Sequence, residues 1–238
     1  MNASSNKKKI STVLILAAIL VMPGFLYYLL QDQGKNRYRP LPIFGPKVVA
    51  STFHSVRGKQ VPDTVYHIVN DFSLTNQKGD TITLDSWKGK VIVLNLFYSK
   101  VNSEGSKLAL KAMREFSELY QKNQMVHLAS LSIDEQDDSN ALIDFSKTWS
   151  AEPKKWDILR GDTATVNKLV KGSLLLDAVN QSTPAERKFI YSNKIILLDT
   201  KHRIRGFYEA SNKEALSKLD DEIKVQIAEE LRNIKDGR

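Results

Sequence analysis

The stretch WKGKVIVLNLF, residues 87–97, decides the fold. Its last seven residues, 91–97, are nearly all apolar and rich in β-branched side chains. Strict alternation would indicate a strand with one face in water, whereas a continuous apolar run of this length is typical of a strand buried on both faces. We therefore expect residues 91–97 to form the central strand of a sheet that is flanked by helices.

Helices and strands alternate from this strand toward the C-terminus, as judged from the spacing of their apolar residues. The sequence predicts a helix at about 107–122, a strand at 126–133, a helix at 139–149, a short strand at 156–159 and a helix at 163–169. A strand at 194–199, a returning strand at 203–208 and an amphipathic helix from 213 to about 233 complete the chain.

Toward the N-terminus, residues 72–74 and 81–83 flank NQKGD and predict a β-hairpin with Gly79 in its turn. A hairpin, a strand–helix–strand unit, further helices, a second hairpin and a terminal helix form an α/β, thioredoxin-like architecture. The right-handed crossover places loop 98–106 at the carboxyl end of the central strand, where open α/β sheets bind their ligands.

An apolar run precedes this domain. Residues 10–30 contain no charge and are long enough, at about 30 Å, to cross a bilayer as a helix. We expect a transmembrane anchor, because the run is long for a cleaved signal peptide. Lysines 7–9 favour a cytoplasmic N-terminus. The predicted organisation is a cytoplasmic segment 1–9, an anchor 10–30, a tether and lead-in 31–70, and a folded domain 71–238 on the periplasmic side of the inner membrane.

Composition excludes several kinds of chemistry. The 238 residues include no cysteine, so the chain has no disulfide, no thiol nucleophile and no cysteine-ligated metal. Its formal net charge is +8, but residues 1–39 contribute +5 of this. The folded part therefore lacks the strongly basic balance that nucleic-acid binding requires, and we expect no nucleic-acid partner.

Four segments of the chain resemble a known family: LPIFGPK at 41–47, YHIVNDFSLTNQKGDTIT at 66–83, WKGKVIVLNLFYS at 87–99 and KFIYSNKIILLDTKHRIRGFYEAS at 188–211. In these segments the chain resembles the SCO/SenC family of membrane-anchored, thioredoxin-like proteins that are associated with copper delivery to cytochrome c oxidase. The resemblance implies the thioredoxin-like fold and a role connected with respiratory oxidase biogenesis.

The resemblance also implies where copper ligands would lie. The two cysteine positions of the family fall on Val101 and Gly105, and its histidine position falls on Tyr191. A register shifted by one residue would place the pair on Lys100 and Glu104. None of these side chains is a thiolate or an imidazole, so we expect no metal at the family site and no bound cofactor.

Other polar residues leave a second interpretation open. Asp134, Glu135, Asp137 and Asp138 follow the strand at 126–133, where they could cap the next helix or bind a hard cation. The histidines, His54, His67, His127 and His202, do not show the spacing of a metal motif.

The expected function is that of a binding or assembly module without enzymatic activity. The predicted contact loop includes Tyr98, Ser99, Lys100, Asn102 and Glu104. Its expected partner is an oxidase assembly factor, an oxidase subunit or a copper-binding paralogue. The alternative is a metal-binding or small-molecule-binding protein that uses the acidic cluster 134–138, a histidine or Tyr191 as replacement ligands.

Overall fold

The computed structural model describes residues 15–17, 19–29, 40–56, 58–100, 103–183 and 188–235. The chain divides into two units, Met1–Arg39 and Pro40–Arg238. Residues 15–17 and 19–29 of the first unit are helical. In the described parts of the chain, no helix combines the length and the apolar composition needed to cross a membrane. The predicted anchor at 10–30 extends outside the described residues at both ends and stays a prediction.

A seven-stranded mixed sheet forms the centre of the second unit, with the strand order β11-β10-β5-β6-β7-β3-β4. Strands β5, β6 and β7 are parallel, and the other neighbours pair antiparallel. The strands are β3 (Ser73–Asn76), β4 (Thr81–Thr83), β5 (Val91–Phe97), β6 (Val126–Ser132), β7 (Trp156–Arg160), β10 (Lys194–Leu198) and β11 (Ile204–Glu209). The predicted α/β, thioredoxin-like fold is confirmed.

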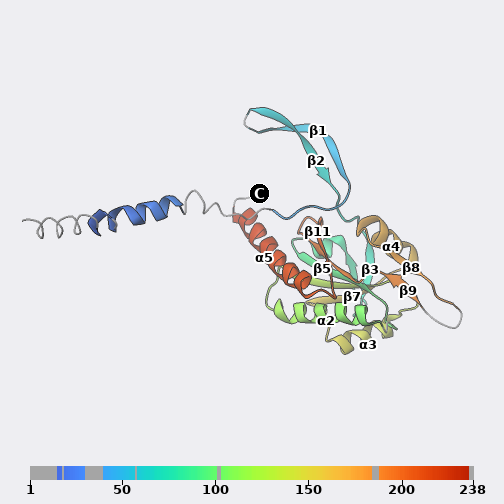
Figure 1. Ribbon diagram of the computed structural model, residues 1–238. Coiled ribbons are helices and arrows are strands. Elements are labelled where there is room, and N and C mark those ends of the chain that lie inside the picture. Colours follow the sequence, from blue (N-terminus) through green and yellow to red (C-terminus); the bar gives the residue numbers. More distant parts are fainter. Residues whose placement is uncertain are drawn as a thin grey trace, which may run out of the picture. The chain divides into compact units, whose positions relative to one another are not determined.

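Helices cover both faces of this sheet (Figure 1). Apolar residues of α2 (Glu104–Leu119), α3 (Ser139–Trp149) and α5 (Lys213–Lys235) share one core cluster. The second cluster includes residues of the 3₁₀ helix η1 (Leu84–Trp87), of α4 (Thr163–Asn167) and of the π-helix η2 (Lys168–Ser173).

Strand β5 contributes to both clusters, as its apolar run predicts. All seven of its residues are buried. Val91, Val93 and Phe97 face the first cluster, whereas Ile92, Leu94 and Leu96 face the second. Alternate side chains of a strand point to opposite faces, so an unbroken apolar run is the pattern that a strand between two helix layers requires.

Helix α2 begins at Glu104, three residues before the predicted start at 107. Ser103 is the reason, because its hydroxyl accepts a hydrogen bond from the Ser106 amide and caps the helix. The predicted helix at 163–169 is also divided, since its hydrogen bonding changes to the π type after Asn167.

Two further hairpins lie outside the main sheet and were not predicted. Strands β1 (Lys47–Val56) and β2 (Lys59–Tyr66) pair with each other inside the segment interpreted as a lead-in. Strands β8 (Ala178–Asn180) and β9 (Phe189–Tyr191) form a second two-stranded sheet. The second hairpin is important for the site below, because β9 carries Tyr191.

Candidate functional site

The loop between β5 and α2 lies at the carboxyl end of the central strand. Val101 and Asn102 of this loop lie outside the described residues. Lys100 and Glu104 are exposed, while Tyr98 and Ser99 are half-buried. Of the described residues, Lys100 in the loop and Glu104 in the first turn of α2 are therefore open to contact.

Strand β9 brings Tyr191 to this turn from 85 residues further along the chain. The Tyr191 hydroxyl lies 2.6 Å from the Ser106 hydroxyl, which is 2.7 Å from the Ser103 hydroxyl. Ser106 also donates to the side-chain oxygen of Asn193 at 3.2 Å. These four side chains form one hydrogen-bonded network that joins the start of α2 to the segment between β9 and β10.

Gly105 lies directly against this network. A Cβ atom added to Gly105 would come within 2.5 Å of the Asn193 side-chain nitrogen. The backbone of Gly105 is helical and does not need glycine for its torsion angles. The close approach of Asn193, rather than backbone conformation, is therefore what favours glycine at this position.

Aromatic rings cover the Tyr191 side of the network. The Tyr98 ring centroid lies 5.1 Å from that of Phe189 and 6.0 Å from that of Tyr191. Burial raises the pKa of Tyr191 to about 12, although the hydrogen bond with Ser106 acts in the opposite direction and the Tyr98 phenol adds to the rise. The Tyr191 phenol is therefore protonated at neutral pH, which makes it a poor metal ligand.

Asp137 fixes the beginning of the loop. Its carboxylate accepts hydrogen bonds from the Ser99 amide at 2.9 Å, from the Ser99 hydroxyl, and from the Ser132 hydroxyl at 2.5 Å. The residue is only 3% exposed. Asp137 thus acts as a structural anchor between β6 and the loop, and its position in the acidic cluster did not reveal this role.

The rest of the acidic cluster is also engaged in local hydrogen bonds. Asp138 is the N-cap of α3 and accepts from the Ala141 amide at 2.8 Å, which confirms the capping interpretation for this residue. Glu135 accepts from the Thr163 hydroxyl, and Asp134 accepts from the Gln136 amide at 2.9 Å.

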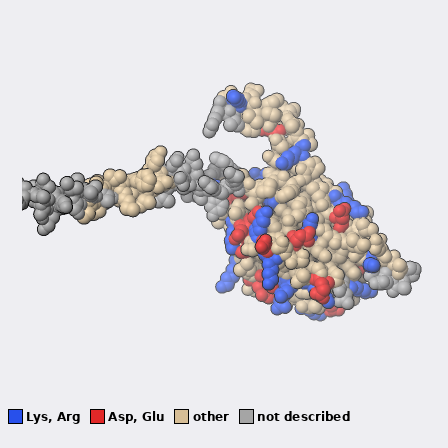
Figure 2. Space-filling view, viewed as in Figure 1, with Lys and Arg blue, Asp and Glu red and all other residues tan. Residues whose placement is uncertain are grey.

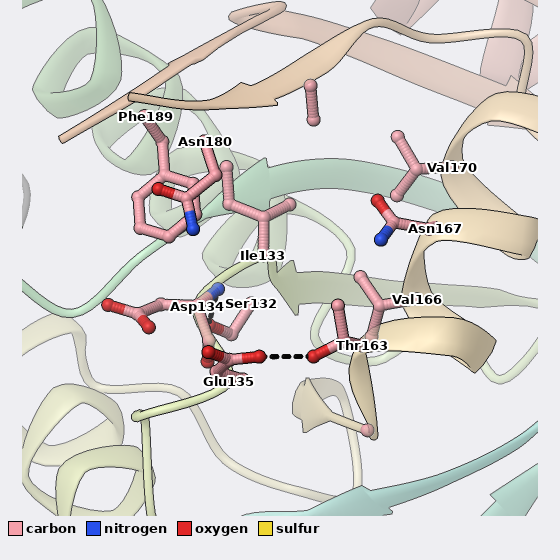
Figure 3. A pocket seen from close by; sticks show the side chains of 12 residues that line it. Ser132, Ile133, Asp134, Glu135, Thr163, Val166, Asn167, Val170, Asn180 and Phe189 are labelled. Atoms are coloured by element: carbon pink, nitrogen blue, oxygen red, sulfur yellow. Dashed lines mark hydrogen bonds between the residues drawn. The ribbon is translucent and has the colours of Figure 1, made fainter. Parts of the chain in front are cut away.

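Asp134 and Glu135 line a cavity of about 60 Å³ between the end of β6, α4 and the β8–β9 hairpin. Figure 3 shows the Glu135–Thr163 hydrogen bond on one side of this cavity and Phe189 on another. Within the described parts of the chain, no group of three or more histidine, aspartate or glutamate side chains could hold a metal ion.

The side chains of three of the four histidines are hydrogen-bonded elsewhere in the domain. His54 is 2.6 Å from Asp63, His67 is 2.7 Å from the carbonyl of Ser173, His127 is 2.8 Å from Asp157, and the Nε2 atom of half-buried His202 is buried without a hydrogen-bond partner. In the part of the chain that the structure describes, none of these hydrogen bonds joins a histidine to Tyr191 or to the acidic cluster 134–138.

These residues do not fit a copper ion. Copper in its reduced state prefers thiolate and thioether ligands. The side chains around Tyr191 and Gly105 offer hydroxyl and amide groups that are already bonded to one another. The methionine nearest to Gly105 in the sequence is Met113 of α2, and its side chain is fully buried in the first core cluster.

Comparison with known proteins gives one family. The model of the family described as SCO1/SenC matches residues 61–224. No curated protein matches the chain.

Several solved structures share the fold. A SCO1/SenC family lipoprotein from Bacillus anthracis is 18% identical, with a TM-score of 0.61 over 68% of this chain and 95% of that chain. Copper-bound ScoI from Bradyrhizobium japonicum is 22% identical, with a TM-score of 0.53 over 65% and 98%. BsSco, described as a member of the Sco family of cytochrome c oxidase assembly proteins, is 19% identical, with a TM-score of 0.57 over 66% and 92%.

Proposed function

The chain belongs to the SCO1/SenC family, and we propose that it serves respiratory oxidase assembly as a membrane-tethered binding module that carries no copper at the family's ligand positions. One similar solved protein is described as a member of a family of cytochrome c oxidase assembly proteins, and others were solved with bound copper. In this role, the protein acts in oxidase assembly by contacting another protein and does not transfer a metal ion.

The hydrogen-bonded network around Ser106 carries this proposal. Tyr191, which we assign to the histidine position, points its hydroxyl at Ser106, one residue after the second cysteine position, Gly105. Asn193 occupies the space next to Gly105. Oxygen and amide groups thus lie between the second cysteine position, Gly105, and the histidine position, Tyr191. Thiol–disulfide exchange is also impossible, since it needs a thiolate and the chain has no cysteine.

The contact surface that we propose is the exposed part of the loop and its surroundings. Lys100 and Glu104 are exposed, and Tyr98, two residues before Lys100, packs against Phe189. Ile190, which follows Phe189 in β9, is 53% exposed. A mixture of exposed apolar surface and single charges suits a protein partner. Figure 2 shows acidic and basic side chains interspersed over the visible face of the domain, which supports the expectation of no nucleic-acid partner.

The proposed location is the periplasmic face of the inner membrane, with the apolar run 10–30 as a single-pass anchor. The run of 21 uncharged residues and the lysines before it support this location. The partners that we propose at this membrane surface are an oxidase subunit, an oxidase assembly factor or a copper-binding paralogue that retains the cysteines.

Photo-cross-linking in the native membrane tests this function. A photoreactive amino acid is placed at Lys100, in the loop, and in a matched variant at Lys111, an exposed lysine on α2. We expect a product with an oxidase subunit, an assembly factor or a cysteine-containing family member from position 100 and not from position 111. Absence of such a product at position 100, or equal yields at both positions, would overturn the proposal.

A further inference from the structure

The β1–β2 hairpin exposes apolar side chains on both of its faces in the part of the chain that the structure describes. Its strands pair only with each other among the described residues and form a separate two-stranded sheet. Figure 1 shows the hairpin projecting from the helix-covered sheet. Strand β1 also precedes residues 61–224, the part of the chain that the family model matches. Most of β2 lies within the matched range, but the hairpin forms a sheet of its own, and the proposed loop function does not use it.

The strand register assigns apolar side chains to both faces of the hairpin. Phe53 pairs with Pro62 and Val49 with Thr64, which places these residues on one face. Val48 and Val65 pair on the other face. Exposure is high on both, at 69% for Val49, 59% for Phe53 and 64% for Val48.

Such a hairpin needs another surface to rest on. A two-stranded hairpin alone in water is only marginally stable, and sheets normally bury one apolar face. The base of this hairpin is held firmly, since the His67 amide donates to the Pro46 carbonyl at 3.2 Å and the His67 ring bonds to the Ser173 carbonyl. The exposed side chains are thus held away from the domain core by an ordered base.

Charge and chain position indicate what that surface is. Residues 47–66 contain three basic side chains and one acidic one, Asp63, which is bonded to His54. The register places this pair on the Val48 face, so the Phe53 face has no acidic residue. The visible surface of the hairpin in Figure 2 is mainly uncharged, with basic groups and a small acidic one. Apolar and aromatic side chains with flanking lysines suit the headgroup region of an anionic bilayer.

The hairpin is also the first described strand pair after the proposed anchor. The 16 residues from 31 to 46 can span at most about 55 Å, so Lys47 stays within that distance of the bilayer that the anchor would enter. We propose that the Val49–Phe53–Pro62 face of the β1–β2 hairpin rests on the surface of an anionic lipid bilayer. The location of the hairpin at the membrane rests on the proposed anchor. The affinity of the hairpin for lipid does not depend on that anchor and can be measured without it.

Vesicle sedimentation of residues 40–238 tests the hairpin without the apolar run. This segment is one compact unit that contains both core clusters, so it can be studied alone. We expect it to sediment with vesicles of phosphatidylglycerol and phosphatidylcholine, and less with phosphatidylcholine alone or at high salt. Val49→Asp and Phe53→Asp should each weaken binding about tenfold or more, since each removes an apolar anchor.

Val179→Asp is the matched control, because Val179 is a 50% exposed valine in the other two-stranded sheet. It should bind vesicles like the unchanged protein, and circular dichroism should show all variants folded. The proposal is overturned if the unchanged segment does not bind anionic vesicles, or if Val179→Asp weakens binding as much as Val49→Asp. A concentration-dependent dimer that Phe53→Asp abolishes, without vesicle binding, would instead assign the face to a second copy of the chain. Photo-cross-linking at Lys100 tests the proposed loop function, and vesicle sedimentation tests the hairpin. Each proposal can therefore fail without the other.

Discussion

A double-mutant cycle between Gly105 and Asn193 tests whether the structure brings the start of α2 and the β9–β10 segment into contact. Gly105→Ala adds a Cβ atom at a position 2.5 Å from the Asn193 side-chain nitrogen. Asn193 must then move, and it loses the hydrogen bond that it accepts from Ser106 at 3.2 Å. Loss of one such bond costs about 0.5–1.5 kcal/mol.

An opposing contribution comes from the unfolded chain. Gly105 has a helical backbone, so alanine there should stabilise the protein by about 0.4–1 kcal/mol through lower unfolded-state entropy. When Asn193 is present, the lost hydrogen bond and the lower unfolded-state entropy nearly cancel in the free energy of unfolding. In the Asn193→Ala protein, the added Cβ atom meets no Asn193 side chain, so Gly105→Ala only stabilises the protein. The cycle should therefore give a coupling free energy of about 1 kcal/mol.

Urea unfolding of the four proteins, followed by circular dichroism, measures this coupling. In thermal unfolding, 1 kcal/mol corresponds to roughly 2–4 °C for a domain of this size. If the two substitutions are additive within about 0.3 kcal/mol, the Asn193 side chain does not lie against Gly105 and the proposed convergence of these two segments is wrong.

Three further predictions concern the loop, the charge network on α5 and the family register. Asp137→Ala should destabilise the domain by about 3 kcal/mol in urea unfolding, because it leaves several buried donors without an acceptor; a loss below about 1 kcal/mol would contradict the anchor role. Burial opposes ionisation of Asp220, yet hydrogen bonds from Lys224 and Tyr120 hold its pKa below the ordinary 3.8. Its contribution to stability is therefore present above pH 3.8 and lost as the pH falls through the lowered pKa, so Asp220→Asn should flatten the acid limb of a stability–pH curve. The combined Val101→Cys, Gly105→Cys and Tyr191→His variant, kept reduced, should gain Cu(I) affinity in a competition titration, and a folded variant without that gain would contradict the register.

Local patterns in the sequence were sufficient to predict the central strand of the main sheet and the helices beside it. The apolar run 91–97 predicted a strand buried on both faces, and β5 has those bounds. The helix predicted at 139–149 matches α3, where Asp138 supplies the expected cap. These elements were predictable because burial on two faces and helix capping each leave a short-range signature.

The hairpins were not predictable in the same way. Strand β1 has valines and a phenylalanine in no regular alternation, because neither face is buried and its register shifts between Val49 and Phe53. Strands β8 and β9 have only three residues each.

The place of the candidate loop at the end of β5 was predictable, but its contacts were not. The carboxyl end of β5 was expected to carry it, and the resemblance pointed to Gly105 and Tyr191. The Tyr191–Ser106 hydrogen bond joins residues 85 positions apart, and no spacing rule connects them. Asn193 and the anchoring role of Asp137 likewise depend on tertiary contacts.

A Cu(I) competition titration of residues 40–238 tests the proposed function most directly. The hydroxyl and amide groups around Ser106 predict no stoichiometric binding at micromolar copper. Stoichiometric binding that Tyr191→Phe abolishes would contradict the account, since it would show that this network holds the metal after all.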